Sequence, residues 1–230
     1  MKILKRLINY FSKFELILWA SSVFFIVASF LIFKNDRYLT LVASLLGVTS
    51  LIFCAKGNPV GQLLMVIFGL LYGYISYTFS YYGEMITYLG MTLPMAAFSL
   101  VSWLRNPYNG NKAEVKIKKI TRGEVVFMLL LSVAVTVVLY FVLAAFDTAN
   151  LIPSTVSVTS SFIAAYLTFK RSPWHSIAYV VNDLILISLW ILASFEDRTY
   201  ISVVVCFFVF LANDTYSFIN WRRIQRRQES

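Results

Sequence analysis

The chain has 230 residues, of which 59% are hydrophobic and only 13% are charged, and its formal net charge is +9. Soluble domains are about half apolar and about one quarter charged, so this composition excludes an ordinary soluble domain and also a disordered chain. The sequence therefore predicts a protein that crosses a membrane several times.

Apolar segments long enough to cross a bilayer recur along the chain, since a span needs about 20 apolar residues of helix. Eight segments meet this requirement: residues 14–33, 39–55, 60–82, 85–104, 124–146, 151–169, 174–195 and 199–219. The first is too long for the apolar region of a signal peptide, so we expect a retained helix. The fourth is the weakest, because Thr87, Thr92 and Pro94 interrupt it. The predicted fold is an all-α membrane protein with eight transmembrane helices.

Basic residues predict the orientation. With the N-terminus in the cytoplasm, 17 of the 20 lysines and arginines fall in cytoplasmic segments, and only Lys34, Arg37 and Arg198 fall outside. Because cytoplasmic loops are enriched in basic residues, we expect a multi-pass protein of the inner (cytoplasmic) membrane with both termini in the cytoplasm. The Lys112–Arg122 cluster would face anionic lipid, which accounts for the net charge without a nucleic-acid partner.

Two parts of the chain resemble each other. A lysine and a proline in the first half each recur as the same residue type 114 positions later. A tryptophan in the first half recurs 118 positions later. The matched pairs are Lys56 with Lys170, Pro59 with Pro173, and Trp103 with Trp221. We expect two parallel three-helix repeats at 39–104 and 151–221, joined by a linker helix at 124–146, with the 14–33 helix outside the repeat. Such transporters bind substrate between the halves, near the membrane midplane.

Two aspartates, Asp183 and Asp214, lie inside predicted spans, where an ionisable group normally faces the bundle interior or a water-filled path. No lysine or arginine lies inside a predicted span, so either the aspartates are protonated or the substrate is a cation. Aromatic and amide side chains at helical spacing suit a flat cation with hydroxyl groups. The candidate substrate-binding residues are Tyr179, Asn182, Asp183, Trp190, Asn213, Asp214, Tyr216, Gln62, Tyr72 and Trp103.

These residues also have structural interpretations. The polar side chains could hold helices together by hydrogen bonds, and for Trp103 and Trp221 anchoring at the membrane interface is favoured over substrate binding. No metal or cofactor is expected, because His175 is the only histidine and the two cysteines are far apart in the sequence. Without a nucleotide-binding loop or a nucleophile motif, neither an ATP-driven pump nor an enzyme is expected, and an intramembrane aspartyl pair is the least favoured alternative.

Four segments carry a resemblance to a known family. They are YGYISY (Tyr72–Tyr77), YGEMITYLGMTLPMAAFSLVSWLRN (Tyr82–Asn106), YVVNDLILISLWILASFED (Tyr179–Asp197) and LANDTYSFINW (Leu211–Trp221). They are similar to segments of the PnuC family of vitamin transporters, whose best-known substrate is nicotinamide riboside. The resemblance implies a duplicated three-helix fold related to SWEET sugar transporters, with Asn182, Asn213 and Trp103 in the binding site. It also implies facilitated diffusion of an unphosphorylated vitamin, which a cytoplasmic kinase then traps.

The function expected from these observations is uptake of nicotinamide riboside, a precursor in NAD biosynthesis, by uniport. Its partners would be this small molecule and membrane lipids, and a homo-oligomer stays open. Asp183 and Asp214 favour a substrate with a fixed positive charge, such as nicotinamide riboside or thiamine, over neutral riboflavin. A thiamine facilitator is therefore the alternative transporter. From another class of function, the alternative is a membrane scaffold or sensor without transport.

Overall fold

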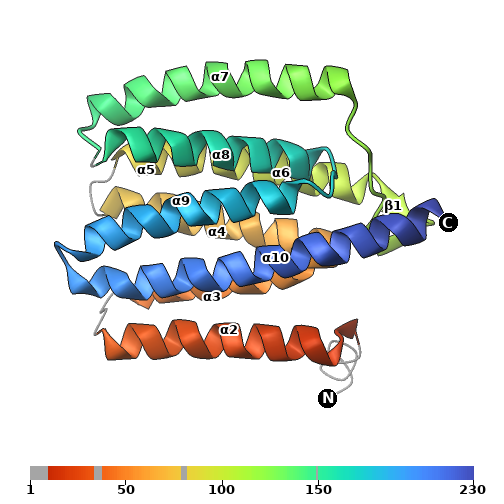
Figure 1. Cartoon of the computed structure of the whole chain (residues 1–230), viewed down its shortest axis with the longest axis horizontal. Helices are drawn as coiled ribbons and strands as arrows, with labels where there is room; N and C mark the ends of the chain where they lie inside the picture. Colours follow the sequence, from red (N-terminus) through yellow and green to blue (C-terminus); the bar gives the residue numbers. More distant parts are fainter. Residues whose placement is uncertain (1–9, 34–37, 79–81, 149) are drawn as a thin grey trace.

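The computed structural model describes residues 10–33, 38–78, 82–148 and 150–230. Within these ranges, eight helical spans lie side by side in one bundle (Figure 1). Each is long and apolar enough to cross a membrane, so the prediction of an all-α membrane protein with eight spans is confirmed. Lys2, Lys5, Arg6, Lys34 and Arg37, which the predicted orientation uses, lie outside the described residues.

The helices follow the predicted segments closely. They are α2 (Lys13–Ile32), α3 (Tyr38–Ala55), α4 (Pro59–Thr78), α5 (Tyr82–Thr87), the π-helix η1 (Tyr88–Thr92), α6 (Leu93–Leu104), α7 (Arg122–Ala145), α8 (Leu151–Phe169), α9 (His175–Ser194), the 3₁₀ turn η2 (Arg198–Tyr200) and α10 (Ile201–Glu229). The predicted last span ends at residue 219, but its helix is longer than the span. The helix continues to Glu229, because the arginine- and glutamine-rich residues after the apolar part are good helix formers that do not need lipid.

The fourth span changes its helical type where the sequence indicated an interruption. It consists of α5, η1 and α6, and Pro94 lies in the first turn of α6. Proline has no backbone N–H and its ring displaces the carbonyl of the preceding turn, so a regular α-helix cannot continue through it. The wider π turn before Pro94 absorbs this defect, as π segments inside α-helices commonly do.

A short antiparallel hairpin that was not among the predicted elements lies between α6 and α7. Its strands are β1 (Pro107–Tyr108) and β2 (Asn111–Val115). Asn109 and Gly110 form the turn with φ of 47° and 77°, as a two-residue Asn-Gly hairpin requires. The buried Val115 donates its N–H to the Gly57 carbonyl at 2.9 Å, so the hairpin packs against one end of the bundle. We call this the hairpin end; α2 begins there and α10 ends there (Figure 1).

The helices α2 and α7 form the two edges of the bundle (Figure 1). The first packs against α3 and α10, and the second packs against α8 and α5. Large apolar side chains point outwards along α7, where Leu130, Val133 and Phe141 are each more than half exposed. Such a surface is expected on a helix that faces lipid, and it would be unusual on a soluble protein.

The turns α3–α4 and α8–α9 have the same backbone hydrogen bonds at an offset of 114 residues. In the first turn, Gly57 donates to Cys54, Asn58 to Phe53 and Gly61 to Asn58; in the second, Arg171 donates to Thr168, Ser172 to Leu167 and His175 to Ser172. Each turn also contains one left-handed residue, Gly57 (φ 65°) in the first and Arg171 (φ 58°) in the second.

Each of these turns also holds an edge helix through a lysine and a glutamate. Lys56 Nζ lies 3.0 Å from a carboxylate oxygen of Glu15 in α2, and Lys170 Nζ lies 3.1 Å from one of Glu124 in α7. Both glutamates close a capping box at the start of their helix. The edge helix α2 therefore contacts the first turn as α7 contacts the second, a correspondence that the sequence did not indicate.

The two matched tryptophans, Trp103 and Trp221, lie together at the hairpin end, with ring centroids 5.4 Å apart. Both are fully buried, so the expectation that they anchor the protein at the membrane interface is wrong. Trp103 Nε1 donates to the Thr168 carbonyl at 2.9 Å, and Trp221 Nε1 donates to the Cys54 carbonyl at 2.8 Å. The end of α6 is thereby fixed to α8, and the part of α10 around Trp221 is fixed to α3, because a buried indole N–H requires an acceptor.

Candidate functional site

A cavity of about 140 Å³ lies inside the bundle and is lined by α3, α4, the fourth span, α8, α9 and α10. Most of its wall is apolar or aromatic, and polar side chains reach it from several helices. The polar and ionisable residues that line it are Cys54, Gln62, Tyr72, Tyr88, Thr92, Ser99, Ser161, Thr168, His175, Tyr179, Asn182, Asp183, Cys206 and Asp214. A largely apolar pocket with a few convergent polar groups is the usual form of a small-molecule site.

Two carboxyl groups dominate the electrostatics of this cavity. Asp183 and Asp214 are 3% and 5% exposed, and their carboxyl groups are in hydrogen-bonding contact with each other. No N–H or O–H group of the described residues reaches Asp183 Oδ2, and no described lysine or arginine lines the cavity. The site therefore has negative charge available and no fixed positive charge to balance it.

The predicted stripe on α9 lines the cavity along most of its length. Tyr179, Asn182, Asp183 and Leu186 all reach it, as their spacing of three or four residues predicts. The Asn182 Oδ1 atom accepts hydrogen bonds of 2.9 Å from the hydroxyl groups of Ser160 and Ser161 on α8. Because these hydroxyls fix the orientation of the amide, Nδ2 is the group that Asn182 can offer to a ligand.

Four of the predicted site residues lie elsewhere. Trp190 packs against Tyr200 of η2, with ring centroids 5.2 Å apart, and Trp103 forms the buried tryptophan pair. Asn213 donates through Nδ2 to Ser22 Oγ at 3.0 Å, and the Tyr216 hydroxyl donates to Glu15 at 2.8 Å. Both of these α10 residues therefore face α2. Asp214 follows Asn213 in the sequence but points about 100° further around the helix, which brings it to the cavity.

On α4, the two predicted residues both line the cavity. Gln62 donates through Nε2 to Cys54 Sγ at 3.2 Å, which places its amide beside α3. The ring of Tyr72 lies 4.7 Å from that of Phe68 and 5.0 Å from that of Tyr88, measured between centroids. These rings form one aromatic wall of the cavity, and such a wall can stack on a flat ligand or attract a cation.

Several lining residues were not among the predicted ones. His175 is the clearest case, since it lies one turn before Tyr179 on the same face of α9, and extending the stripe by four residues would have found it. Its Nδ1 lies 2.8 Å from the Ser172 carbonyl and its Nε2 lies 3.2 Å from Ser176 Oγ. The described residues contain no group of three or more histidine, cysteine or acidic side chains that could hold a metal ion.

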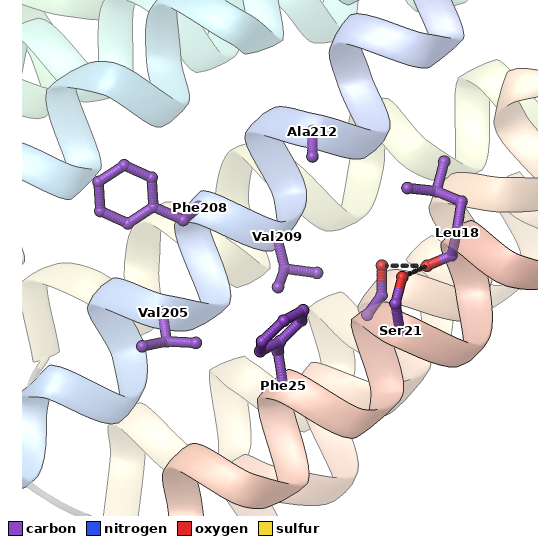
Figure 2. Close-up of a pocket in the computed structure, with 8 residues that line it drawn as sticks. Leu18, Ser21, Phe25, Val205, Phe208, Val209 and Ala212 are labelled. Carbon is purple, nitrogen blue, oxygen red and sulfur yellow. Dashed lines mark hydrogen bonds between the residues drawn. The ribbon is translucent and has the colours of Figure 1, made fainter.

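A second cavity, of about 330 Å³, lies between α2 and α10 and is almost entirely apolar (Figure 2). Phe25, Val205 and Val209 form much of its wall. Its polar groups are the hydroxyls of Ser21 and Ser22, and both donate to the Leu18 carbonyl of their own helix. Because this groove offers no free polar group and lies at the edge of the bundle, the central cavity is the candidate site for a polar substrate.

A bundle of membrane-spanning helices around a buried site with polar groups from several helices has the architecture of a membrane transporter. The family model described as "Nicotinamide mononucleotide transporter" matches residues 37–223, so the chain belongs to this family, the family of the PnuC proteins. The predicted resemblance is thereby confirmed.

Relatives and a solved structure agree with this assignment. The nicotinamide riboside transporter PnuC of Neisseria mucosa is 29% identical over 227 residues, covering 97% of this chain and 86% of the relative. The protein of the same name from Haemophilus influenzae is 24% identical over 198 residues, covering 84% and 82%. The crystal structure of a vitamin B3 transporter PnuC is similar with a TM-score of 0.79 and 28% identity, covering 95% of this chain and 94% of that one.

Proposed function

We propose that this protein carries nicotinamide riboside through the membrane and binds it in the central cavity. The observation that carries this proposal is the pair of carboxyl groups in a cavity without a described lysine or arginine. The substrate has a fixed positive charge on its pyridinium ring, which would balance a buried carboxylate. Both relatives described above have names that specify the same substrate.

The same electrostatics favour the riboside over its phosphorylated form. A phosphate adds about 1.5 to 2 negative charges at neutral pH, which the two buried carboxyl groups would repel. Arginine or lysine normally neutralises a phosphate in a binding site, and no described residue of either type lines this cavity. Transport of the unphosphorylated vitamin agrees with the expectation that a separate cytoplasmic kinase traps it.

Seven lining residues have proposed roles in binding the substrate. Asp183 and Asp214 balance the pyridinium charge, and Asn182 Nδ2 donates to a ribose or carboxamide oxygen. Gln62 supplies a second amide, while Tyr72, Tyr88 and Tyr179 offer their ring faces to the flat pyridinium. Asn213, Tyr216, Trp103 and Trp190 act outside the cavity by holding helices together. No covalent chemistry is assigned to any of these residues, and we propose a transporter without enzymatic activity.

We further propose that the hairpin end faces the cytoplasm and that the protein lies in the cytoplasmic membrane. Among the described residues, most basic residues of the connecting segments are at this end, as expected for the cytoplasmic side. Lipid would cover the apolar outer faces of the edge helices.

The repeat proposed from the structure is larger than the expected one. The matched turns and lysine–glutamate pairs support two units of four spans, from α2 to α6 and from α7 to α10, facing each other across the cavity. In this arrangement the first helix is the counterpart of α7, which the sequence had suggested to be only a linker.

Uptake into proteoliposomes that contain only this protein tests the proposed function. Labelled nicotinamide riboside is expected to enter and equilibrate without ATP, and unlabelled riboside should compete while nicotinamide mononucleotide should not. Absence of uptake by correctly folded protein would favour the scaffold or sensor. Uptake of thiamine in preference to the riboside would favour the alternative transporter.

A further inference from the structure

The two carboxyl groups of the cavity are in direct contact. Two ionised carboxylates cannot occupy one buried site without strong repulsion, and they relieve it by holding a single proton between them. A hydrogen bond between two carboxyl groups also requires that one of them carries a proton. Asp183 and Asp214 are both buried in the same cavity, and a hydrogen bond between them would require the pair to hold one proton and keep one negative charge.

The surroundings of the pair contain no other source of positive charge among the described residues. The titratable side chains that face the cavity are Cys54 of α3, Tyr72 of α4, Tyr88 of η1, His175 and Tyr179 of α9, and Cys206 of α10. α8 contributes only neutral groups. Of these residues, only His175 ordinarily changes its charge near neutral pH.

The hydrogen bonds of His175 suit the neutral form of its ring. Nδ1 donates to the Ser172 carbonyl, and in the neutral ring Nε2 can accept from the hydroxyl of Ser176, which in turn lies 2.9 Å from Ser217 Oγ. The residue is 3% exposed and has no carboxylate among these partners. These partners do not require a second proton on His175, which leaves the aspartate pair as the candidate proton site of the cavity.

We propose that Asp183 and Asp214 share one proton in the empty cavity and that a cationic substrate displaces it. On binding, the proton leaves the pair for water and the cation takes its place between two ionised carboxylates. When the substrate leaves, the pair takes a proton back from water. The net charge of the cavity is −1 with or without the substrate, so binding does not change the net buried charge. A carrier that returns empty with its proton exchanges one proton for each substrate cation, and this exchange replaces the uniport expected from the sequence. This inference rests on the proposed function, because the pyridinium of nicotinamide riboside supplies the cation.

The exchange has a defined pH dependence. A ligand that displaces a proton competes with it, so affinity increases as the pH rises. While the empty pair is protonated and the complex is not, the dissociation constant should fall by up to about tenfold per pH unit. It should become independent of pH once the empty pair has lost its proton.

Calorimetric titration of the purified protein measures the exchange directly. The heat of binding nicotinamide riboside, recorded at one pH in buffers with different ionisation enthalpies, gives the number of protons released. We expect close to one proton per ligand at neutral pH. Reduced dihydronicotinamide riboside has nearly the same shape without the fixed charge, and it should bind weakly and release no proton.

Three variants identify the groups that hold the proton. In Asp183→Asn and in Asp214→Asn, the introduced amide can donate to the remaining carboxylate and keep it ionised, so proton release should fall close to zero. The matched variant His175→Gln should retain the release. The proposal would be overturned if His175→Gln no longer released a proton on binding, or if both aspartate variants still released one.

Infrared spectroscopy of the ligand-free protein tests the pair without any substrate. The spectrum at neutral pH should contain a protonated carboxyl C=O band that disappears in the double variant Asp183→Asn/Asp214→Asn. An identical band in both proteins would overturn the proposal. If the riboside fails to bind but the band behaves as expected, the assignment of the substrate is wrong and the shared proton stands. If the riboside binds without releasing a proton, the assignment of the substrate is supported and the proposal of proton displacement is wrong.

Discussion

At the scale of single residues, a variant of Asp183 can show whether this residue binds the substrate or only holds helices together. The variant Asp183→Asn keeps the shape of the side chain and removes one negative charge from the cavity. Affinity for nicotinamide riboside should fall by about 1.5–3 kcal/mol, the range of a charge-assisted hydrogen bond, or roughly ten- to a hundredfold in dissociation constant. The melting temperature should change little, because the amide can donate to Asp214.

Asn213 provides the matched control, since it is equally buried but faces α2. Asn213→Ala removes the hydrogen bonds to Ser22 and to the Val209 carbonyl, and it should lower stability by about 1–2 kcal/mol while affinity stays nearly unchanged. Binding assays and thermal melting of both variants make the comparison. If Asp183→Asn bound the riboside as well as the unaltered protein but melted earlier, both aspartate and asparagine would be helix contacts.

Gly57 is a second position where a single residue determines a local structure. Its φ of 65° is costly for any residue with a Cβ atom, and a Cβ here would lie 3.2 Å from Val115 of the hairpin. Gly57→Ala should therefore destabilise the protein by about 1–2 kcal/mol, measured as a lower melting temperature. Gly123→Ala is the control, because a Cβ at that position meets nothing within 4 Å. Equal melting temperatures for the two variants would contradict this account of the turn.

At the scale of elements, the two lysine–glutamate pairs differ in their surroundings. Glu15 is 3% exposed at its side chain and accepts from Lys56 and Tyr216, while the side chain of Glu124 is 19% exposed. Removing one partner of a buried pair costs about 3–5 kcal/mol and an exposed pair contributes up to about 1 kcal/mol, and the partly exposed Glu124 pair lies between these two limits. Glu15→Ala should therefore lower the melting temperature much more than Glu124→Ala. Similar losses in both variants would mean that α2 and α7 are held mainly by their apolar contacts.

The elements themselves were largely predictable, because the length of a span follows from the thickness of the bilayer and hydropathy reports it directly. Pro94 and the threonines near it also indicated where the fourth span is irregular. The sequence did not predict which residues of α10 face the cavity. Asn213 and Asp214 are adjacent and both polar, and only tertiary packing decides which of them faces the cavity and which faces α2.

Other features could not be predicted for related reasons. A tryptophan beside arginines at the end of a helix has the same local pattern whether it meets lipid or a second tryptophan, so the burial of Trp103 and Trp221 was missed. The Asn109–Gly110 turn did carry a recognisable hairpin signal, but the strands it joins are too short to show an alternating pattern. Which residues face the cavity depends on how each helix is rotated about its own axis, and the hydropathy of the sequence does not determine this rotation.

At the scale of the whole molecule, the proposed orientation can be tested by labelling introduced cysteines. The native Cys54 and Cys206 are buried, so the background should be low. In intact cells, Glu196→Cys, in the turn between α9 and α10, should react with a membrane-impermeant reagent. Lys112→Cys, in the hairpin, should react only after the membrane is opened. The reverse pattern would place the hairpin end outside and overturn the orientation.

The two final spans of the proposed units differ in stiffness. The fourth span contains a π segment between two α-helices, whereas α10 is one continuous helix of 29 residues, and both line the same cavity. A π segment has an irregular hydrogen-bond ladder and deforms more easily than a regular helix. The wall formed by the fourth span can therefore change its curvature while the wall formed by α10 stays straight. Opening and closing of the site should then be unequal between the halves, and a ligand that stiffens Tyr88–Thr92 would hold the molecule in one shape without occupying the substrate's place.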